Sequence, residues 1–248
     1  MSIETHLHDL KFRLMTIELL RTAKKHYTYR ELAQRTNLPV TVLSRYVKGH
    51  VLPTTKRAKN IWSALEKMIS LEEELRGRIR FDEFGYFDNT SIISDLSLLN
   101  QAAQHALSKF AGHRITKVLT AAVDGIPLAT TVSATLGVDL IIAKKTKEVG
   151  VHDFTEETYI PSNSAIMMAL YIPKGIIKKG DSVLIVDDVI RSGETQRALI
   201  NLVTKSRAEV AGIFALIAVG EEWEKSIETP SNCPTEIMLQ VKPKIERK

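Results

Sequence analysis

The sequence has a single cysteine, Cys233, among its 248 residues, which excludes an internal disulfide and is typical of proteins from a reducing compartment. Its apolar runs are short, well below the roughly 18 residues that a membrane span requires. The first residues lack a basic segment followed by an apolar one, so we expect no secretion signal. These absences predict a cytoplasmic protein with no membrane partner.

Several common ligand-binding patterns are also missing. The chain contains no GxGxxG fingerprint, no Walker A loop, no HExxH pair and no zinc-type spacing of Cys and His. His6 and His8 lie close together near the start, where a surface role is a better interpretation than metal ligation. We therefore predict no metal site built from protein side chains, and we assign no catalytic residue.

Charge is unevenly distributed along the chain. Residues 1–80 contain 16 Lys/Arg and 8 Asp/Glu, a net charge of +8, whereas the remaining residues contain 18 and 21, a net charge of −3. A basic N-terminal third in front of a mildly acidic remainder indicates a module that binds a polyanion. By charge alone, a solvated basic surface is an equally good interpretation.

Helical spacing and turn signals divide the basic third into short helices. Thr28 and Glu31 have the spacing of a capping box, Asn37 suits a left-handed helix exit, and Pro39 suits the start of the next helix. We predict helices over residues 11–25, 29–35 and 40–48.

Residues 31–46 resemble a helix-turn-helix of the phage-repressor type, in which two short helices flank a tight turn. The resemblance implies binding to double-stranded DNA through the start and outer face of the second helix, which carries Val40, Thr41, Ser44, Arg45 and Lys48. Arg45 could read a guanine edge or contact a phosphate, and the sequence leaves both open. A helical hairpin used only for dimerisation is the structural alternative.

A helical connector over residues 70–80 is expected to end the first domain, so we predict domains over residues 1–80 and 81–248. Strand patterns then alternate with helical ones, beginning with a single helix over 89–110 whose cap lies among residues 89–91. The strands are expected at 115–122, 138–143, 165–171, 182–186 and 210–219. This alternation predicts an α/β fold with a mostly parallel sheet. We expect 165–171 to pair with 182–186, and 146–164 to be a loop.

The most informative stretch covers residues 183–195. Four apolar residues, three of them β-branched, predict a strand buried on both faces. Asp187 and Asp188 follow at the expected solvent-facing end of this strand, and a Ser/Gly/Thr turn leads into a helix. The backbone N–H groups of such a turn can hold a phosphate, while the carboxylates accept hydrogen bonds from a diol. A ribose 5-phosphate carries both groups at this separation.

This stretch resembles the phosphoribosyl-pyrophosphate (PRPP) loop of type I phosphoribosyltransferases. The resemblance implies that Asp187 and Asp188 bind the ribose hydroxyls, and that the 5-phosphate is surrounded by Ser192, Gly193, Glu194 and Thr195. Arg191 is a further ligand-binding candidate, because its charge could offset that of Glu194 beside a phosphate. Arg191 stands where the family usually has a small residue, and Glu194 where a second glycine is common. The motif therefore supports ligand binding more firmly than turnover.

The same resemblance extends upstream of the loop. Val123, Asp124 and Gly125 occupy the position of the family's pyrophosphate-binding loop. Lys144 or Lys145 stands where basic side chains reach pyrophosphate. Residues 146–164 fall where the family carries a flexible, hood-like loop over its active site.

A basic helix-turn-helix in front of a phosphoribosyltransferase-like domain resembles the bacterial purine-repressor group and related prokaryotic regulators. This implies a homodimeric, ligand-responsive transcription factor of purine or nucleotide metabolism. Its expected effector is PRPP or a purine nucleotide, with Mg²⁺ as a further candidate. Two alternatives remain open: an active purine phosphoribosyltransferase of the adenine or xanthine type that carries a DNA-binding domain, and a PRPP-binding scaffold whose N-terminal helices only dimerise.

Overall fold

A computed structural model describes residues 3–66, 70–83, 86–161, 166–227 and 233–243. The chain divides into two compact units, Met1–Glu74 and Leu75–Lys248, and helix α5 (Leu71–Arg78) spans the boundary between them. The domain boundary that we predicted near residue 80 lies just after this helix. No helix within the described ranges combines the length and apolar character needed to cross a bilayer.

The described part of the N-terminal unit contains α1 (Ile3–His26), α2 (Tyr29–Thr36), α3 (Val40–Val47) and α4 (Thr55–Glu66). The capping box is present: Thr28 Oγ1 accepts a hydrogen bond from the N–H of Glu31, and the Glu31 carboxylate accepts one from the N–H of Thr28. Asn37 ends α2 in the left-handed conformation, with φ of 53°. Pro39 is the residue immediately before α3.

One hydrophobic core holds these helices together. Leu20 of α1, Leu32 of α2, Leu43 of α3, and Ile61 and Leu65 of α4 belong to it, and each has no exposed surface. Fully burying such a side chain contributes roughly 1.5–3 kcal/mol. Because α3 packs on this core through Leu43, its opposite face is left to solvent.

The second unit opens with two helices where we predicted one. After the antiparallel pair β1 (Arg80–Phe81) and β2 (Phe87–Asp88), helix α6 (Thr90–Ile93) ends at Ser94, and α7 (Leu96–Lys109) begins anew. The prediction of one helix over 89–110 is therefore wrong. Asp95 causes the break, because its extended backbone interrupts the helix and its carboxylate caps α7 by accepting hydrogen bonds from the N–H groups of Ser97 and Leu98.

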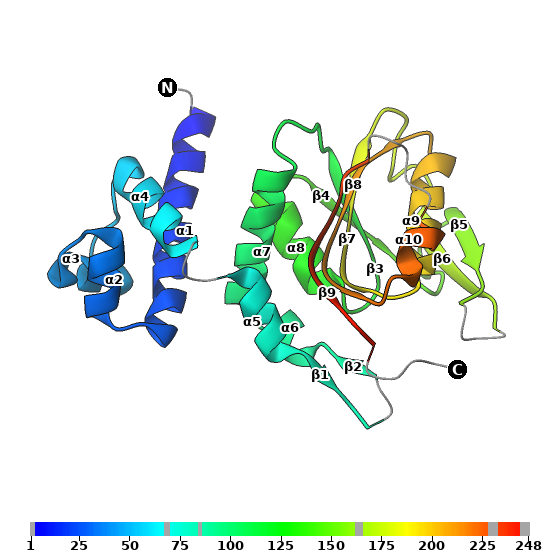
Figure 1. Ribbon diagram of the computed structural model, residues 1–248. Helices are drawn as coiled ribbons and strands as arrows, with labels where there is room; N and C mark the ends of the chain where they lie inside the picture. The colour runs from blue at the N-terminus through cyan, green and yellow to red at the C-terminus, as the bar shows by residue number, and fades with distance from the viewer. Residues whose placement is uncertain (1–2, 67–69, 84–85, 162–165, 228–232, 244–248) are drawn as a thin grey trace. The chain divides into compact units, whose positions relative to one another are not determined.

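A parallel sheet in the order β4-β3-β7-β8-β9 forms the centre of this unit (Figure 1). Its strands are β3 (Lys117–Ala121), β4 (Asp139–Ala143), β7 (Ser182–Ile190), β8 (Glu209–Val219) and β9 (Thr235–Val241). Helices α7 and α8 (Ile126–Leu136) cover one face, and α9 (Glu194–Lys205) covers the other, with the short α10 (Glu222–Ser226) next to it. The predicted α/β class and parallel sheet are confirmed. Strand β9, which the C-terminal segment contributes, was not predicted.

The segment predicted as a loop, 146–164, contains strand β5 (Phe154–Tyr159). It pairs antiparallel with β6 (Met168–Pro173), so the predicted pairing of 165–171 with 182–186 is wrong. The neighbours of β7 are β3 and β8 instead. Strand β5 belongs to a half-exposed ribbon outside the main sheet, which explains why its sequence carries no core pattern.

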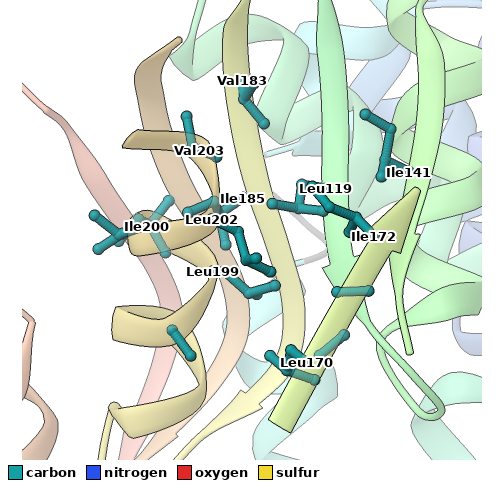
Figure 2. Packing of buried hydrophobic residues seen from close by; sticks show 14 of the residues in the cluster. Leu119, Ile141, Leu170, Ile172, Val183, Ile185, Leu199, Ile200, Leu202 and Val203 are labelled. Carbon is teal, nitrogen blue, oxygen red and sulfur yellow. The ribbon is translucent and has the colours of Figure 1, made fainter. Parts of the chain in front are cut away.

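The main core of the second unit lies between the sheet and α9, and it reaches the β5–β6 ribbon (Figure 2). Leu119 of β3, Ile185 of β7, and Leu199 and Leu202 of α9 are completely buried there. Leu170 of β6 is also completely buried in this cluster. The ribbon is thus anchored to the main sheet by apolar packing.

Candidate ligand cleft and DNA-binding face

The two adjacent aspartates lie inside β7 and not beyond its end. The strand continues to Ile190, and Asp187 pairs in register with Ala215 of β8. Asp187 is 7% exposed and Asp188 is 5% exposed, so the prediction that both face solvent is wrong. The reason is tertiary: β7 is the middle strand of the sheet, and side chains from distant segments cover both carboxylates.

Consecutive residues of a strand point to opposite faces, so the two carboxylates have different partners. Asp187 Oδ2 accepts a hydrogen bond from Gln196 Nε2 at 2.6 Å, and Asp187 Oδ1 accepts one from the N–H of Asp188 at 3.1 Å. Burial and the neighbouring Asp188 carboxylate raise the pKa of Asp187 well above its ordinary value. Additional hydrogen-bond donors, such as sugar hydroxyls, would favour the charged form of this carboxylate.

Asp188 is held by Asn89, whose Nδ2 donates a hydrogen bond to Asp188 Oδ2. Burial raises the pKa of Asp188, and the Asp124 charge acts in the same direction, while the hydrogen bond from Asn89 opposes both. Asn89 was among the residues expected to cap a helix, but its side chain makes no capping hydrogen bond. Sequence reasoning missed its role because the two residues are 99 positions apart.

The turn after β7 leads directly into helix α9. Gly193 adopts the left-handed conformation, with φ of 79°, and is the cap of α9. A Cβ at this position would lie 3.0 Å from both Ile227 Cγ1 and the Trp223 carbonyl oxygen, so glycine is required on two grounds. The first N–H groups of α9 have no partner within the helix, which makes them suitable for binding a phosphate.

A cleft of about 300 Å³ lies over this turn. Its lining combines the predicted loop with groups from other segments: Arg191, Ser192, Gly193, Glu194, Thr195, Gln196, Val189, Lys145, Tyr159, Pro161 and Met168. The structure thus brings all five predicted loop residues together. The Glu194 carboxylate is buried and accepts a hydrogen bond from Ser192 Oγ, so much of its charge is satisfied within the loop.

The two candidate lysines separate in space. Lys145 lines the cleft over the phosphate turn. Lys144 forms an ion pair with Glu148 and lines a different cleft of about 210 Å³, next to Phe154 and Tyr171. Successive side chains of extended backbone point opposite ways, which explains the separation. Of the two, Lys145 is the one that lines this cleft, and its contact with a ligand phosphate remains a prediction.

Residues 123–125 connect β3 to α8 beside the acid pair. Val123 and Asp124 are exposed, and the peptide bond between Ala122 and Val123 is cis. Gly125 is buried: a Cβ built on it would lie 2.5 Å from Thr120 Oγ1 and 2.6 Å from Asp187 Oδ1. The backbone of this loop therefore touches Asp187, which joins the two predicted motifs in space.

The β5–β6 ribbon forms a wall of the cleft and is tied to α9 by polar contacts. Asn201 Nδ2 donates to Glu157 Oε1 at 2.8 Å, and Lys205 Nζ lies 2.5 Å from Glu157 Oε2. Lys205 also donates to the carbonyl oxygen of Glu156 at 2.8 Å. Helix α9 consequently carries the phosphate turn at its start and the ribbon along its side. The sequence predicted a loop over the site at 146–164, which includes Tyr159, but it did not predict that this wall is a strand pair or that Met168 belongs to it.

In the N-terminal unit, the outer face of α3 carries the residues predicted to contact DNA. Val40, Thr41, Arg45 and Lys48 are exposed, and Ser44 is half-buried. Leu43 and Tyr46 fill the inner face. The exposed Arg45 of α3 and the exposed Lys48 just after the helix have the chemistry to contact phosphates or guanine edges. The contacts themselves remain a prediction.

Comparison with known proteins finds a matching family for each of the two parts of the chain. Residues 90–245 match the family described as phosphoribosyl transferase domain, and residues 17–69 match a helix-turn-helix family. A hypoxanthine/guanine phosphoribosyltransferase from Methanotorris igneus is 34% identical over 163 residues, which cover 61% of this chain and 83% of that protein. The purine biosynthesis transcriptional repressor PurR of Bacillus subtilis is 31% identical over 166 residues, which cover 67% of this chain and 57% of the repressor. The match thus spans less than two thirds of that repressor's length.

Solved structures show the same fold. An adenine phosphoribosyltransferase from Rhodothermus marinus superposes with a TM-score of 0.61 at 28% identity, covering 69% of this chain and 98% of that one. An adenine phosphoribosyltransferase from Trypanosoma brucei, solved with AMP, pyrophosphate and ribose-5-phosphate, superposes with a TM-score of 0.62 at 15% identity, covering 68% of this chain and 79% of that one. At 15% identity the second likeness concerns the fold alone.

Proposed function

This chain belongs to the phosphoribosyl transferase domain family and carries a helix-turn-helix in its N-terminal part, and on that basis we propose that it is a DNA-binding transcriptional regulator of purine metabolism. Its second unit would sense PRPP or a purine nucleotide. One observation carries the proposal: the Gly193 turn lines a cleft together with Gln196, which donates a hydrogen bond to Asp187 of the aspartate pair, in a chain whose other unit exposes Arg45 on α3 and Lys48 just after it.

The residues that line the cleft and the buried aspartate pair, which Gln196 contacts, together offer a group for each part of a phosphoribosyl ligand. The N–H groups at the start of α9 would bind the 5-phosphate. Asp187 and Asp188 would accept hydrogen bonds from the ribose hydroxyls, and Lys145 and Arg191 would balance further phosphate charge. Mg²⁺ would be held chiefly by the ligand's phosphates, because no three His, Cys, Asp or Glu side chains converge in the part of the chain that the structure describes.

Regulation requires the ligand to bind the DNA-bound and DNA-free states with different affinity. Helix-turn-helix regulators read two half-sites through two copies of the recognition helix, so we propose that the protein acts as a homodimer. It would work in the cytoplasm, in the same compartment as the chromosome. A cleft occupant that changes the placement of two DNA-binding units would then change operator affinity.

The direct test is a gel-shift titration at moderate salt with DNA from upstream of the protein's own operon, with and without PRPP. We expect sequence-preferring binding whose affinity changes when PRPP is added. Arg45→Ala should weaken binding, whereas Lys59→Ala, which removes one exposed charge from α4, should have a smaller effect. The absence of sequence preference in both conditions would contradict the proposed function.

A second candidate is an active purine phosphoribosyltransferase with a DNA-binding unit. The 34% identity to a hypoxanthine/guanine phosphoribosyltransferase, over 83% of that enzyme, favours it. Catalysis would rest on electrostatic positioning, with Asp187 and Asp188 beside the positive charge that develops on the ribose. An assay of pyrophosphate release from PRPP in the presence of Mg²⁺, with adenine, hypoxanthine, guanine or xanthine as the base, distinguishes this enzyme from a regulator without turnover. Turnover with any of these bases would establish the enzyme.

A further inference from the structure

An arginine of the connector helix contacts the segment that follows β2. Arg78 is the last residue of α5, the helix that spans the boundary between the two units. Its Nη1 donates to the carbonyl oxygen of Ser91 at 2.8 Å, and its Nη2 lies 2.7 Å from Asp95 Oδ2. Both side chains of this ion pair are about three-quarters buried. A partly buried, doubly bonded guanidinium is a directional contact and not merely a solvated charge.

The opposite end of the same segment reaches the aspartate pair. Asn89 immediately precedes α6 and donates its side-chain hydrogen bond to Asp188 Oδ2. Its backbone oxygen accepts hydrogen bonds from the N–H groups of Ile92 and Ile93, at 2.8 and 3.0 Å. Residues 89–95 therefore contact the candidate ligand site at their start and the connector helix at their end.

The segment between these two contacts is held at its middle by packing and at its end by hydrogen bonds. Ile92, at its middle, is 1% exposed and is packed into the unit. Asp95, at its end, accepts hydrogen bonds from Ser97 and Leu98 and so caps α7, while also pairing with Arg78. A displacement of Asn89 would therefore be carried through α6 to both acceptors of Arg78.

We propose that Asn89 and Arg78 are positioning residues that couple occupation of Asp188 to the connector helix, and hence to the DNA-binding unit. The inference rests on the proposed function and names its route of regulation. It would make residues 89–95 the element whose placement differs between the DNA-bound and DNA-free states.

The coupling has a defined physical origin. Asp188 is 5% exposed, and the Asn89 amide occupies Oδ2, one of the two oxygens through which Asp188 could accept a hydrogen bond from a sugar hydroxyl. A hydroxyl that donates to Oδ2 requires this amide to share the oxygen or to move. The free energy of ligand binding then differs between states in which residues 89–95 are placed differently. Such a difference is what a ligand needs to shift an equilibrium.

The test uses the full chain and the variants Arg78→Gln and Asn89→Ala. PRPP affinity is measured by calorimetry, and DNA affinity by fluorescence anisotropy on the upstream fragment, with and without saturating PRPP. The readout is the coupling ratio, the factor by which PRPP changes the DNA dissociation constant, which is about 5–150 in typical allosteric proteins. In Arg78→Gln we expect this ratio to fall to near 1, while PRPP affinity and DNA affinity without PRPP each stay within about threefold of wild type.

Arg80→Gln is the matched control, because the Arg80 guanidinium donates to the carbonyls of Gly77 and Ile79 within its own segment. It should retain the wild-type ratio. In Asn89→Ala the coupling ratio should also fall to near 1, and PRPP affinity should change as well, because the substitution removes a direct hydrogen-bond partner of Asp188. Arg78→Lys keeps a charge for Asp95 but not the forked contact, so an intermediate ratio is expected even if Arg78→Gln folds poorly.

The possible failures can be distinguished. A wild-type protein that binds neither PRPP nor specific DNA overturns the proposed function and this inference with it. If wild type binds both and its ratio is well above 1, but Arg78→Gln and Asn89→Ala keep that ratio, the proposed function stands and the route through residues 89–95 is wrong. A wild-type ratio of 1 also overturns the route.

Discussion

Replacing Gly125 with alanine is expected to disturb the aspartate pair without adding or removing any charge. The new Cβ would lie 2.5 Å from Thr120 Oγ1 and 2.6 Å from Asp187 Oδ1, whereas ordinary van der Waals contact begins at 3.4 Å, so these atoms must separate by about 0.9 Å. Thr120 is completely buried in β3 and cannot move away cheaply. Most of the displacement should therefore fall on the Asp187 carboxylate and the 123–125 loop.

The expected loss of stability and of PRPP affinity follows from the hydrogen bonds that the Asp187 carboxylate accepts. Its carboxylate accepts hydrogen bonds from Gln196 at 2.6 Å and from the N–H of Asp188 at 3.1 Å, and a shift of this size weakens both. Overpacking a buried site costs about 1–3 kcal/mol in the free energy of unfolding. Losing one well-placed hydrogen bond to a charged group costs about 1.5–3 kcal/mol, so PRPP affinity should fall at least tenfold.

Thermal unfolding and calorimetric titration with PRPP measure the two effects on one preparation. Gly77→Ala is the matched control, because a Cβ at that position in α5 meets nothing within 4 Å. It should leave PRPP affinity unchanged and raise stability by about 0.5–1 kcal/mol, since alanine favours a helix over glycine. Wild-type stability together with wild-type PRPP affinity in Gly125→Ala would refute the close approach of this loop to Asp187.

Three further outcomes are expected. Asp187→Asn and Asp188→Asn should each weaken PRPP binding strongly in calorimetry. The control Asp139→Asn should not, because Asp139 lies at the start of β4 with its side chain 81% exposed. Equal PRPP affinities for all three variants would show that Asp187 and Asp188 are not part of the site. The raised pKa of Asp187 means that the folded protein holds this carboxyl proton more tightly than the unfolded chain does. Wild-type stability should therefore fall as the pH rises from 3.8, the ordinary pKa of the group, through its raised pKa in the folded protein. Thermal unfolding of Asp187→Asn across the same pH range should lack that fall. Arg45→Ala should weaken operator binding by ~1–3 kcal/mol if the side chain reads a base, and an unchanged gel shift would exclude Arg45 from the interface.

Features that depend on neighbouring residues could be predicted from the sequence. The capping box at Thr28 and the left-handed exit at Asn37 involve backbone preferences over a few positions, and the structure has both. The apolar run that opens residues 183–195 predicts a buried strand because its residues are almost all β-branched, and β7 is that strand. The alternation of strands and helices was sufficient to establish the α/β class.

Features that depend on which segments meet could not be predicted in this way. The pattern placed Asp187 and Asp188 at an exposed strand end, but neighbouring strands and Asn89 bury them. In residues 154–159, apolar and polar side chains alternate too weakly to indicate a strand, because one side of the β5–β6 ribbon is open to solvent. The helix expected over 89–110 breaks at Asp95, whose cap and pairing with Arg78 outweigh the helical spacing.

By itself, then, the amino-acid order established the class of fold and the helix-turn-helix pattern, and it predicted that residues 191–195 bind a phosphate. It could not establish which of Lys144 and Lys145 lines the cleft, which amide covers Asp188, or that residues 89–95 reach both the acids and the connector helix. Backbone preference acts over a few residues, so it can be read locally. The partner of a buried side chain is supplied by whichever distant segment packs against it, and for Asp188 that segment lies 99 residues away.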